Sequence, residues 1–277
     1  MLIKIITIIA YLAYKFIIIV YFIYMLFKHF TNKVFNYFFN ISFIFFANCA
    51  LAKDDRMQKI SYYSIDLTEV SIGEFNKFTN TTNYITEAEK RGWGYVYSSG
   101  WIKKDGWNWK KPYGIKGELN EPAVHINFNE AQMFCKWKDK RLPSEEEWIY
   151  AAYTEMRKTS SSNFIYGQTY EYPVVDTPEG VNCLEDCKFE NNVNYKNLLS
   201  RGNGHSKVGV TKKGINGLYD MGANVWEWAN IENKRTKATK GGSWWYGKEQ
   251  MRLSHQARKD KNMSAVYIGF RCVKNLN

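Results

Sequence analysis

The pattern of apolar and polar residues divides the chain of 277 residues into two unequal parts. Residues 1–52 consist largely of isoleucine, phenylalanine and tyrosine runs and contain no aspartate or glutamate. From Lys53 onwards, apolar and charged residues alternate as is typical of a globular domain. The pattern therefore predicts an N-terminal hydrophobic segment, 1–52, and one folded domain, 53–277, which is long enough to enclose a sizeable core.

The N-terminal segment has the layout of a secretory signal. Lysines accompany its beginning, an apolar stretch occupies residues 34–46, and Ala50-Leu51-Ala52 offers the small-x-small pattern that a signal peptidase recognises. We expect cleavage after Ala52 and export to the bacterial periplasm or the medium.

A second apolar run, residues 5–27, leaves an alternative open. At roughly 20 residues it is long enough to span a bilayer, so an uncleaved segment would anchor the domain in the membrane, facing the periplasm. Met25 is also a natural start site, in which case residues 1–24 precede the true start.

Three short helices are predicted by pairs of residues that can cap a helix. In each pair a short polar side chain accepts from a free amide, and an acid three residues later reaches back to the chain. Apolar residues at helical spacing follow. The pairs are Ser71 with Glu74, Asn127 with Glu130, and Ser144 with Glu147.

After Tyr153 the periodicity fades and turn sequences rich in glycine, proline and asparagine dominate. Only short runs such as 206–210 and 267–273 are typical of strands. The sequence shows no internal repeat or linker. It predicts a single α+β domain with few short helices, short strands and long loops.

Charge and cysteines add two expectations. Without the four lysines of residues 1–52, the net charge of +11 becomes +7, and the lysines are dispersed, so we expect no nucleic-acid partner. Without Cys49, four cysteines remain, an even number that favours two disulfides in an oxidising compartment. Cys183 and Cys187 share a short loop, which leaves Cys135 for Cys272; a metal site is the weaker alternative, because no suitable histidine spacing accompanies them.

Aromatic residues gather between residues 93 and 109, at Trp93, Tyr95, Tyr97, Trp101, Trp107 and Trp109. They either fill the space between irregular loops or form an aromatic rim along a binding groove. The sequence leaves both interpretations open.

Short motifs follow one another in a fixed order along most of the domain. Among them are Lys-Arg-Leu-Pro-Ser-Glu-Glu-Glu-Trp at 140–148, Asn-Gly-Leu-Tyr-Asp-Met-Gly-Ala-Asn-Val-Trp-Glu-Trp at 216–228, Gly-Gly-Ser-Trp at 241–244 and Gly-Phe-Arg-Cys at 269–272. Further matching stretches lie at 73–78, 83–89, 121–128 and 131–137. In order and spacing this set resembles the formylglycine-generating enzymes, or sulfatase-modifying factors, from about Ile65 to Val273.

The resemblance implies a fold related to C-type lectins and a disulfide between Cys135 and Cys272. It also implies calcium bound by the loop that contains Asn224, Val225 and Glu227, since calcium prefers such oxygen ligands. A second calcium loop would fall near Asn192 and Val193. The alternative is that Asn224 and Glu227 only accept hydrogen bonds from loop amides.

The two cysteines that perform the oxidation in this family are replaced here. By the family's spacing from Ser243, their positions hold Tyr246 and Met251. A phenol and a thioether cannot reproduce the thiolate pair that suits copper(I), so we expect no copper. The family's groove residues would correspond to Ser243, Trp244, Tyr246, Met251, His255 and Arg258.

Three functions are compatible with this pattern, and they leave open whether the protein is an enzyme. The first is an exported pseudoenzyme that binds a protein or peptide client in the cell envelope. The second is an enzyme of the same family with altered chemistry, of the kind that matures chromophores. The third is formylglycine generation by another route.

Overall fold

The computed structural model describes residues 56–159, 164–175, 177–184, 187–189 and 203–276, with scattered helical positions at 15, 18–20, 22, 25 and 28. Residues 56–277 form one compact unit, and residues 1–55 are not part of it. The predicted signal, its cleavage after Ala52 and the second start at Met25 concern a segment that lies largely outside the described residues. Among the positions described, no helix is long and apolar enough to cross a membrane.

The three predicted helices are confirmed. They are α2 (Ile72–Thr82), α4 (Phe128–Trp137) and α5 (Glu145–Tyr153), and each begins at the expected pair of capping residues with both reciprocal hydrogen bonds formed. A fourth helix, α3 (Glu87–Arg91), starts in the same way at Thr86 and Glu89. Local capping chemistry therefore determines where these helices begin.

Short strands form three small sheets. β1 (Met57–Lys59), β2 (Tyr63–Asp66) and β9 (Val273–Asn275) pair antiparallel in the order β1-β2-β9, so the two ends of the domain meet. β3 (Trp93–Tyr97) and β4 (Trp101–Asp105) form a hairpin. The third sheet has the order β7-β6-β5-β8, from β7 (Ala257–Asp260), β6 (Thr236–Lys240), β5 (Trp226–Ala229) and β8 (Ile268–Gly269).

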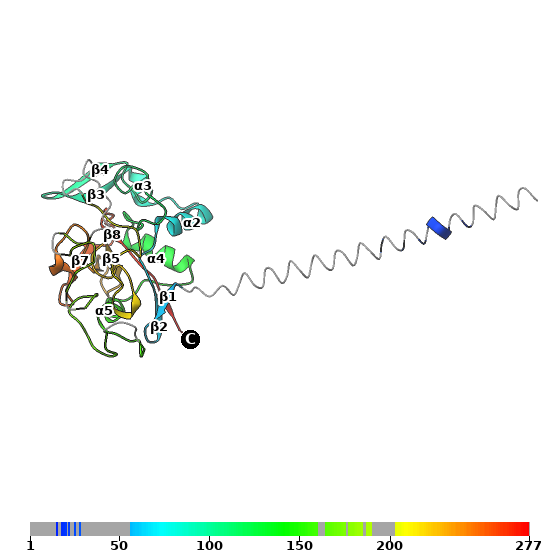
Figure 1. Ribbon diagram of the computed structural model, residues 1–277. Coiled ribbons are helices and arrows are strands. Elements are labelled where there is room, and N and C mark those ends of the chain that lie inside the picture. The colour runs from blue at the N-terminus through cyan, green and yellow to red at the C-terminus, as the bar shows by residue number, and fades with distance from the viewer. Residues whose placement is uncertain are drawn as a thin grey trace, which may run out of the picture. The chain divides into compact units, whose positions relative to one another are not determined.

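The arrangement places the largest sheet in the middle of the domain. Figure 1 shows the β3–β4 hairpin and α3 at one end, β1, β2 and α5 at the other, and β5, β7 and β8 between them. Two 3-10 helices, η1 (Ile215–Gly217) and η2 (Lys248–Met251), lie in the connecting loops. The α+β architecture with short elements and long loops agrees with the sequence-based expectation.

The predicted strand at 206–210 is wrong, because side chains and a distant loop engage its backbone. The amides of Ser206 and Gly209 donate to the side chains of Asn224 and Asp220, and the amide of Val208 donates to a carbonyl at residue 120. The predicted strand at 267–273 forms only at its two ends, as β8 and the first residue of β9. Between them, two carbonyls accept from the amides of Asp66 and Val70.

Aromatic packing joins the helices to the C-terminal segment. The ring of Phe75 on α2 stacks on Phe134 of α4 with 5.7 Å between centroids, and Phe270 meets both rings edge-on. All three side chains are buried. Burying a phenylalanine side chain contributes roughly 1.5–3 kcal/mol to the free energy of unfolding before the loss of side-chain entropy is counted.

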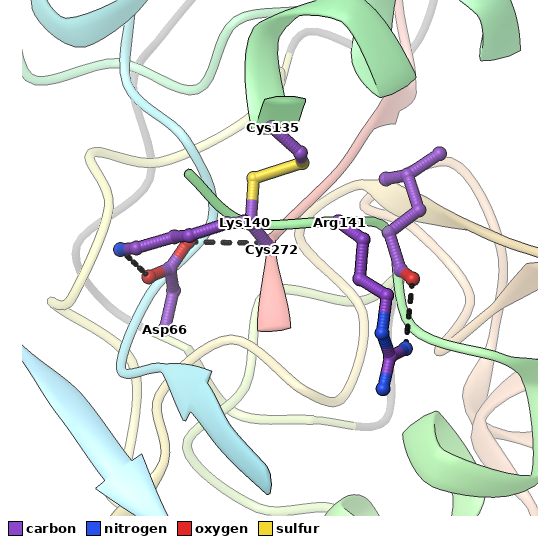
Figure 2. Close-up of a disulfide and its surroundings, with 6 residues drawn as sticks. Asp66, Cys135, Lys140, Arg141 and Cys272 are labelled. Atoms are coloured by element: carbon purple, nitrogen blue, oxygen red, sulfur yellow. Dashed lines mark hydrogen bonds and ion pairs between the residues drawn. A yellow bond between two sulfur atoms is a disulfide. The ribbon is translucent and has the colours of Figure 1, made fainter. Parts of the chain in front are cut away.

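Both predicted disulfides are confirmed, Cys135 with Cys272 and Cys183 with Cys187. The first joins residues 137 positions apart and ties the C-terminal half of α4 to the end of the chain. Figure 2 shows Lys140 and Asp66 beside it: Lys140 Nζ lies 2.7 Å from Asp66 Oδ1, and the amide of Cys272 donates to Asp66 Oδ2. Asp66 therefore connects Lys140 to the backbone of Cys272 beside the disulfide.

Candidate functional site

The loop predicted to bind calcium and the groove predicted around Ser243 lie side by side. The amide of Trp244 donates to the Asn224 carbonyl at 2.9 Å, and the amide of Tyr246 donates to the Ser243 carbonyl, which forms a turn. Ala223 and Asn224 both have positive φ, 60° and 47°, a conformation that most residues avoid but asparagine tolerates. This bend directs the chain into β5, which carries Trp226 and Glu227.

Glu227 takes part in a buried ion pair with Arg271. Arg271 Nε donates to Glu227 Oε2 and its Nη2 to Oε1, both at 2.7 Å, and the indole of Trp148 donates to Oε2. The guanidinium also donates to the carbonyls of Asp66 and Tyr219. The pair is completely enclosed, and buried charges persist only when they are paired and hydrogen-bonded in this way.

The side chain of Asn224, like that of Glu227, is hydrogen-bonded to several protein groups. Its Oδ1 accepts from Asn182 Nδ2 and from both the amide and the hydroxyl of Ser206, at 2.8–3.0 Å. Its Nδ2 donates to Glu69 Oε2 at 2.7 Å.

These hydrogen bonds do not fit the calcium site that the sequence suggested. Calcium requires six to eight oxygen ligands, whereas the side-chain oxygens of Asn224 and Glu227 already accept from protein donors. Within the described residues, no group of three or more acidic, histidine or cysteine side chains is placed to hold a metal. The second predicted site, at Asn192 and Val193, lies outside those residues.

Two further buried carboxyl groups lie close enough to Glu227 to interact with it. Burial raises the pKa of Glu69 well above its usual value, and the charges of Asp220 and Glu227 raise it further. Burial also raises the pKa of Asp220, although Thr211 and the amide of Gly209 donate to it. One arginine thus faces three carboxyl groups, so a proton on Glu69 is the least costly way to reduce the charge.

Three of the predicted groove residues meet in an aromatic cluster around Trp226, and a fourth, Ser243, lies next to it in the sequence. Its ring lies 5.7 Å from Tyr246 and 5.8 Å from His255, centroid to centroid. Tyr246 packs edge-on to Tyr267 at 6.2 Å, and Tyr267 in turn contacts Trp244 at 6.3 Å. Ser243 is buried at the beginning of the same turn. We name the set Trp226, Trp244, Tyr246, His255 and Tyr267 the aromatic cluster.

Two indole N–H groups in the aromatic cluster are left without an acceptor. Trp226 and Trp244 are each only 2% exposed, and within the described part of the chain neither Nε1 finds a hydrogen-bond partner. A buried donor without an acceptor costs about 1–3 kcal/mol. Ordered water or a ligand can supply the acceptor that the described chain does not.

The other two predicted groove residues lie elsewhere. Met251 is buried in a separate hydrophobic cluster with Tyr172, Val174 and Ala223, and its thioether packs against Gly222. Arg258 on β7 is exposed and forms a bidentate pair with Glu145 at 2.8–2.9 Å. Tyr246 and Met251, which the family's spacing predicts at the two oxidase positions, therefore belong to different clusters, and neither offers a thiolate.

Some of the aromatic residues between 93 and 109 fill the core, and others are exposed where they could line a binding site. Trp107 and Trp109 are buried, so they fill the core. Tyr97 and Trp101 are more than a third exposed on the β3–β4 hairpin. Trp101 reaches the aromatic cluster, because its ring lies 5.8 Å from that of Tyr267. Sequence reasoning missed Tyr267, although its position in a strand-like run next to Gly-Phe-Arg-Cys was a usable signal.

Comparison with known proteins identifies the family of this chain. Residues 49–276 match the sulfatase-modifying factor enzyme 1-like domain. The inactive C-alpha-formylglycine-generating enzyme 2 of Bos taurus is 27% identical, over 76% of this chain and 76% of its own length. The formylglycine-generating enzyme of Mus musculus is 26% identical, over 78% and 67%.

Among solved structures, PvdO from Pseudomonas aeruginosa has a TM-score of 0.54 at 18% identity, over 77% of this chain and 80% of its own. That likeness concerns the fold alone, and it agrees with the architecture described above. From the match to residues 49–276 we conclude that the chain belongs to the sulfatase-modifying factor, or formylglycine-generating enzyme, family.

Proposed function

We propose that this protein is an exported binding or accessory protein that holds a peptide of a client protein against the aromatic cluster and does not oxidise it. The observation that carries the proposal is the pair of buried indole N–H groups, Trp226 Nε1 and Trp244 Nε1, which have no acceptor within the described chain. Peptide carbonyls are acceptors of the required kind, and because both N–H groups are buried, a bound peptide must displace a neighbouring side chain to reach them.

The chemistry of the neighbouring rings supports a peptide ligand. Tyr246 is partly exposed and Trp101 on the β3–β4 hairpin more than a third exposed, so both offer apolar area at low entropic cost, and both pack against the buried ring of Tyr267. Aromatic side chains of this kind dominate the energetics of binding sites. Hydrogen bonds from buried donors to a ligand carbonyl would remove a desolvation cost as well as add contact.

The cysteine chemistry argues against oxidation. All four cysteines between residues 135 and 272 are in disulfides, and by the family's spacing Tyr246 and Met251 stand where its thiolates would be. Two of the relatives, from Bos taurus and Mus musculus, are themselves named inactive. These points favour binding over an enzyme of altered chemistry, the second function that the sequence allowed.

The proposal can be tested by following the indole N–H resonances of the purified protein in ¹⁵N–¹H spectra. A cysteine-containing sulfatase-type peptide is the probe, and Trp226→Phe and Trp244→Phe assign the two resonances and remove one donor each. We expect both resonances to move on peptide addition. Each substitution should weaken binding about 5- to 10-fold, as loss of one hydrogen bond predicts.

Trp137→Phe is the matched control, because Trp137 lies on α4 and is exposed. It should leave the affinity within twofold of the parent protein. Equal weakening by all three substitutions, or binding that leaves the two resonances in place, would contradict the proposed site. Conversion of the peptide's cysteine would contradict the proposed function.

A further inference from the structure

One cavity of the domain is lined by none of the residues of the aromatic cluster. It has a volume of about 670 Å³ and is formed by the beginning of α4, the turn between β5 and β6, and the loop after β7. Phe128 lies in its wall, and most of its other lining side chains are polar. Its size suits a small-molecule ligand.

Three lysines face this cavity: Lys234, Lys237 and Lys261. The ammonium of Lys237 donates to the carbonyl of Ile231 at 2.7 Å and to Asn230 Oδ1 at 3.0 Å, and it lies 4.9 Å from the centre of the Phe128 ring. These partners are uncharged. An ammonium has three N–H donors, so one donor of Lys237 remains for a ligand.

The positive charge of the cavity is not balanced by the protein. Within the part of the chain that the structure describes, neither Lys234 nor Lys261 forms an ion pair, and neither does Glu232, the acidic residue in the lining. Three ammonium groups against one carboxylate leave a net charge of +2. Burial lowers the pKa of Lys237, and the charge of Lys261 lowers it further.

Crowded like charges cost free energy unless something offsets them. Elsewhere in the described chain some lysines meet carboxylates, as Lys140 meets Asp66 and Lys274 meets Asp139. Concave surfaces lined by one sign of charge raise the local concentration of the opposite ion. Lysine is a common ligand of phosphate and related oxyanions.

We propose that this cavity is a binding site for a small, multiply charged oxyanion, a phosphate-, sulfate- or carboxylate-bearing ligand, held by Lys234, Lys237 and Lys261. Amide side chains such as that of Asn129 can donate to the same ligand. The site is independent of the aromatic cluster, so it can be tested whether or not the peptide proposal holds.

Isothermal titration with inorganic pyrophosphate, sulfate and citrate distinguishes the three kinds of oxyanion. We expect one of them to bind with a stoichiometry of one and to bind more weakly as sodium chloride rises from 50 to 200 mM, because salt screens the lysines. The double substitution Lys234→Glu with Lys261→Glu should weaken that binding at least tenfold.

The control is Lys103→Glu with Lys104→Glu, which makes the same charge change on the exposed strand β4. It should leave the affinity within threefold, since it alters only the general charge. Equal weakening by both pairs would show unspecific attraction to a basic protein and overturn the site. Absence of binding of all three probes at 5 mM would overturn it as well.

Discussion

Trp226 and Glu227 are neighbours on β5, and their surroundings differ completely. Successive side chains of a strand point to opposite faces. On one face, Glu227 receives three hydrogen bonds from Arg271 and Trp148. On the other, Trp226 packs between Tyr246 and His255 with its indole N–H unpaired in the described chain.

The comparison distinguishes two roles: one side chain stabilises the fold, and the other is available to bind a ligand. In this buried ion pair four of the five arginine N–H donors are hydrogen-bonded within the protein, so little remains for another molecule, and losing either partner leaves the other charged and unpaired in the interior. Buried donors without acceptors lower stability. We therefore assign Glu227 and Arg271 to stability, and Trp226 and Trp244 to binding.

The largest expected effect comes from breaking the ion pair. Arg271→Met leaves the Glu227 carboxylate buried without its partner and should lower the free energy of unfolding by about 3–5 kcal/mol. Urea denaturation measures it. Arg258→Met, which breaks the exposed pair with Glu145, should cost less than about 1 kcal/mol. Similar losses for both would mean that Glu227 is not the stabilising centre described here.

The buried carboxyl group of Glu69 should give stability a pH dependence of definite sign. Because its pKa is raised by burial and by Asp220 and Glu227, the folded state retains a proton that the unfolded chain releases above about pH 4.5. Its contribution to stability is therefore present at low pH and is lost as pH rises towards the folded-state pKa.

Glu69→Gln removes this titration while leaving the other groups in place. Burial lowers the pKa of His125 to about 4, which gives the opposite slope between pH 4 and 6.5, but that term cancels between variant and parent. The stability of the variant relative to the parent should rise with pH above 4.5, by up to about 1.4 kcal/mol per pH unit. A constant difference from pH 4.5 to 8 would show that Glu69 is ionised throughout.

The smallest expected effect is that of a chelator. Since the side-chain oxygens of Asn224 and Glu227 are occupied by protein donors, EDTA should shift Tm by less than about 1 °C. An ion that binds only the folded state would raise Tm in proportion to the logarithm of its concentration. A clear rise with added calcium would restore the site that the family resemblance implied.

The sequence predicted local features better than the surroundings of individual side chains. Capping pairs such as Ser71 with Glu74 act over three residues, so they identify the helix starts directly. The strand expected at 206–210 failed because its amides bond to Asn224 and Asp220, which are distant in the sequence. The family spacing identified Tyr246 and Met251, but only the structure places them in separate clusters.

The central claim is that this site binds without oxidising, and one measurement tests it directly. The purified protein, supplied with copper(I), oxygen and a cysteine-containing sulfatase-type peptide, is followed by mass spectrometry of the peptide. Because four cysteines are in disulfides and the family's spacing predicts Tyr246 and Met251 at the thiolate positions, the account predicts that the peptide mass stays unchanged while the peptide binds. Conversion of the cysteine to formylglycine would contradict it.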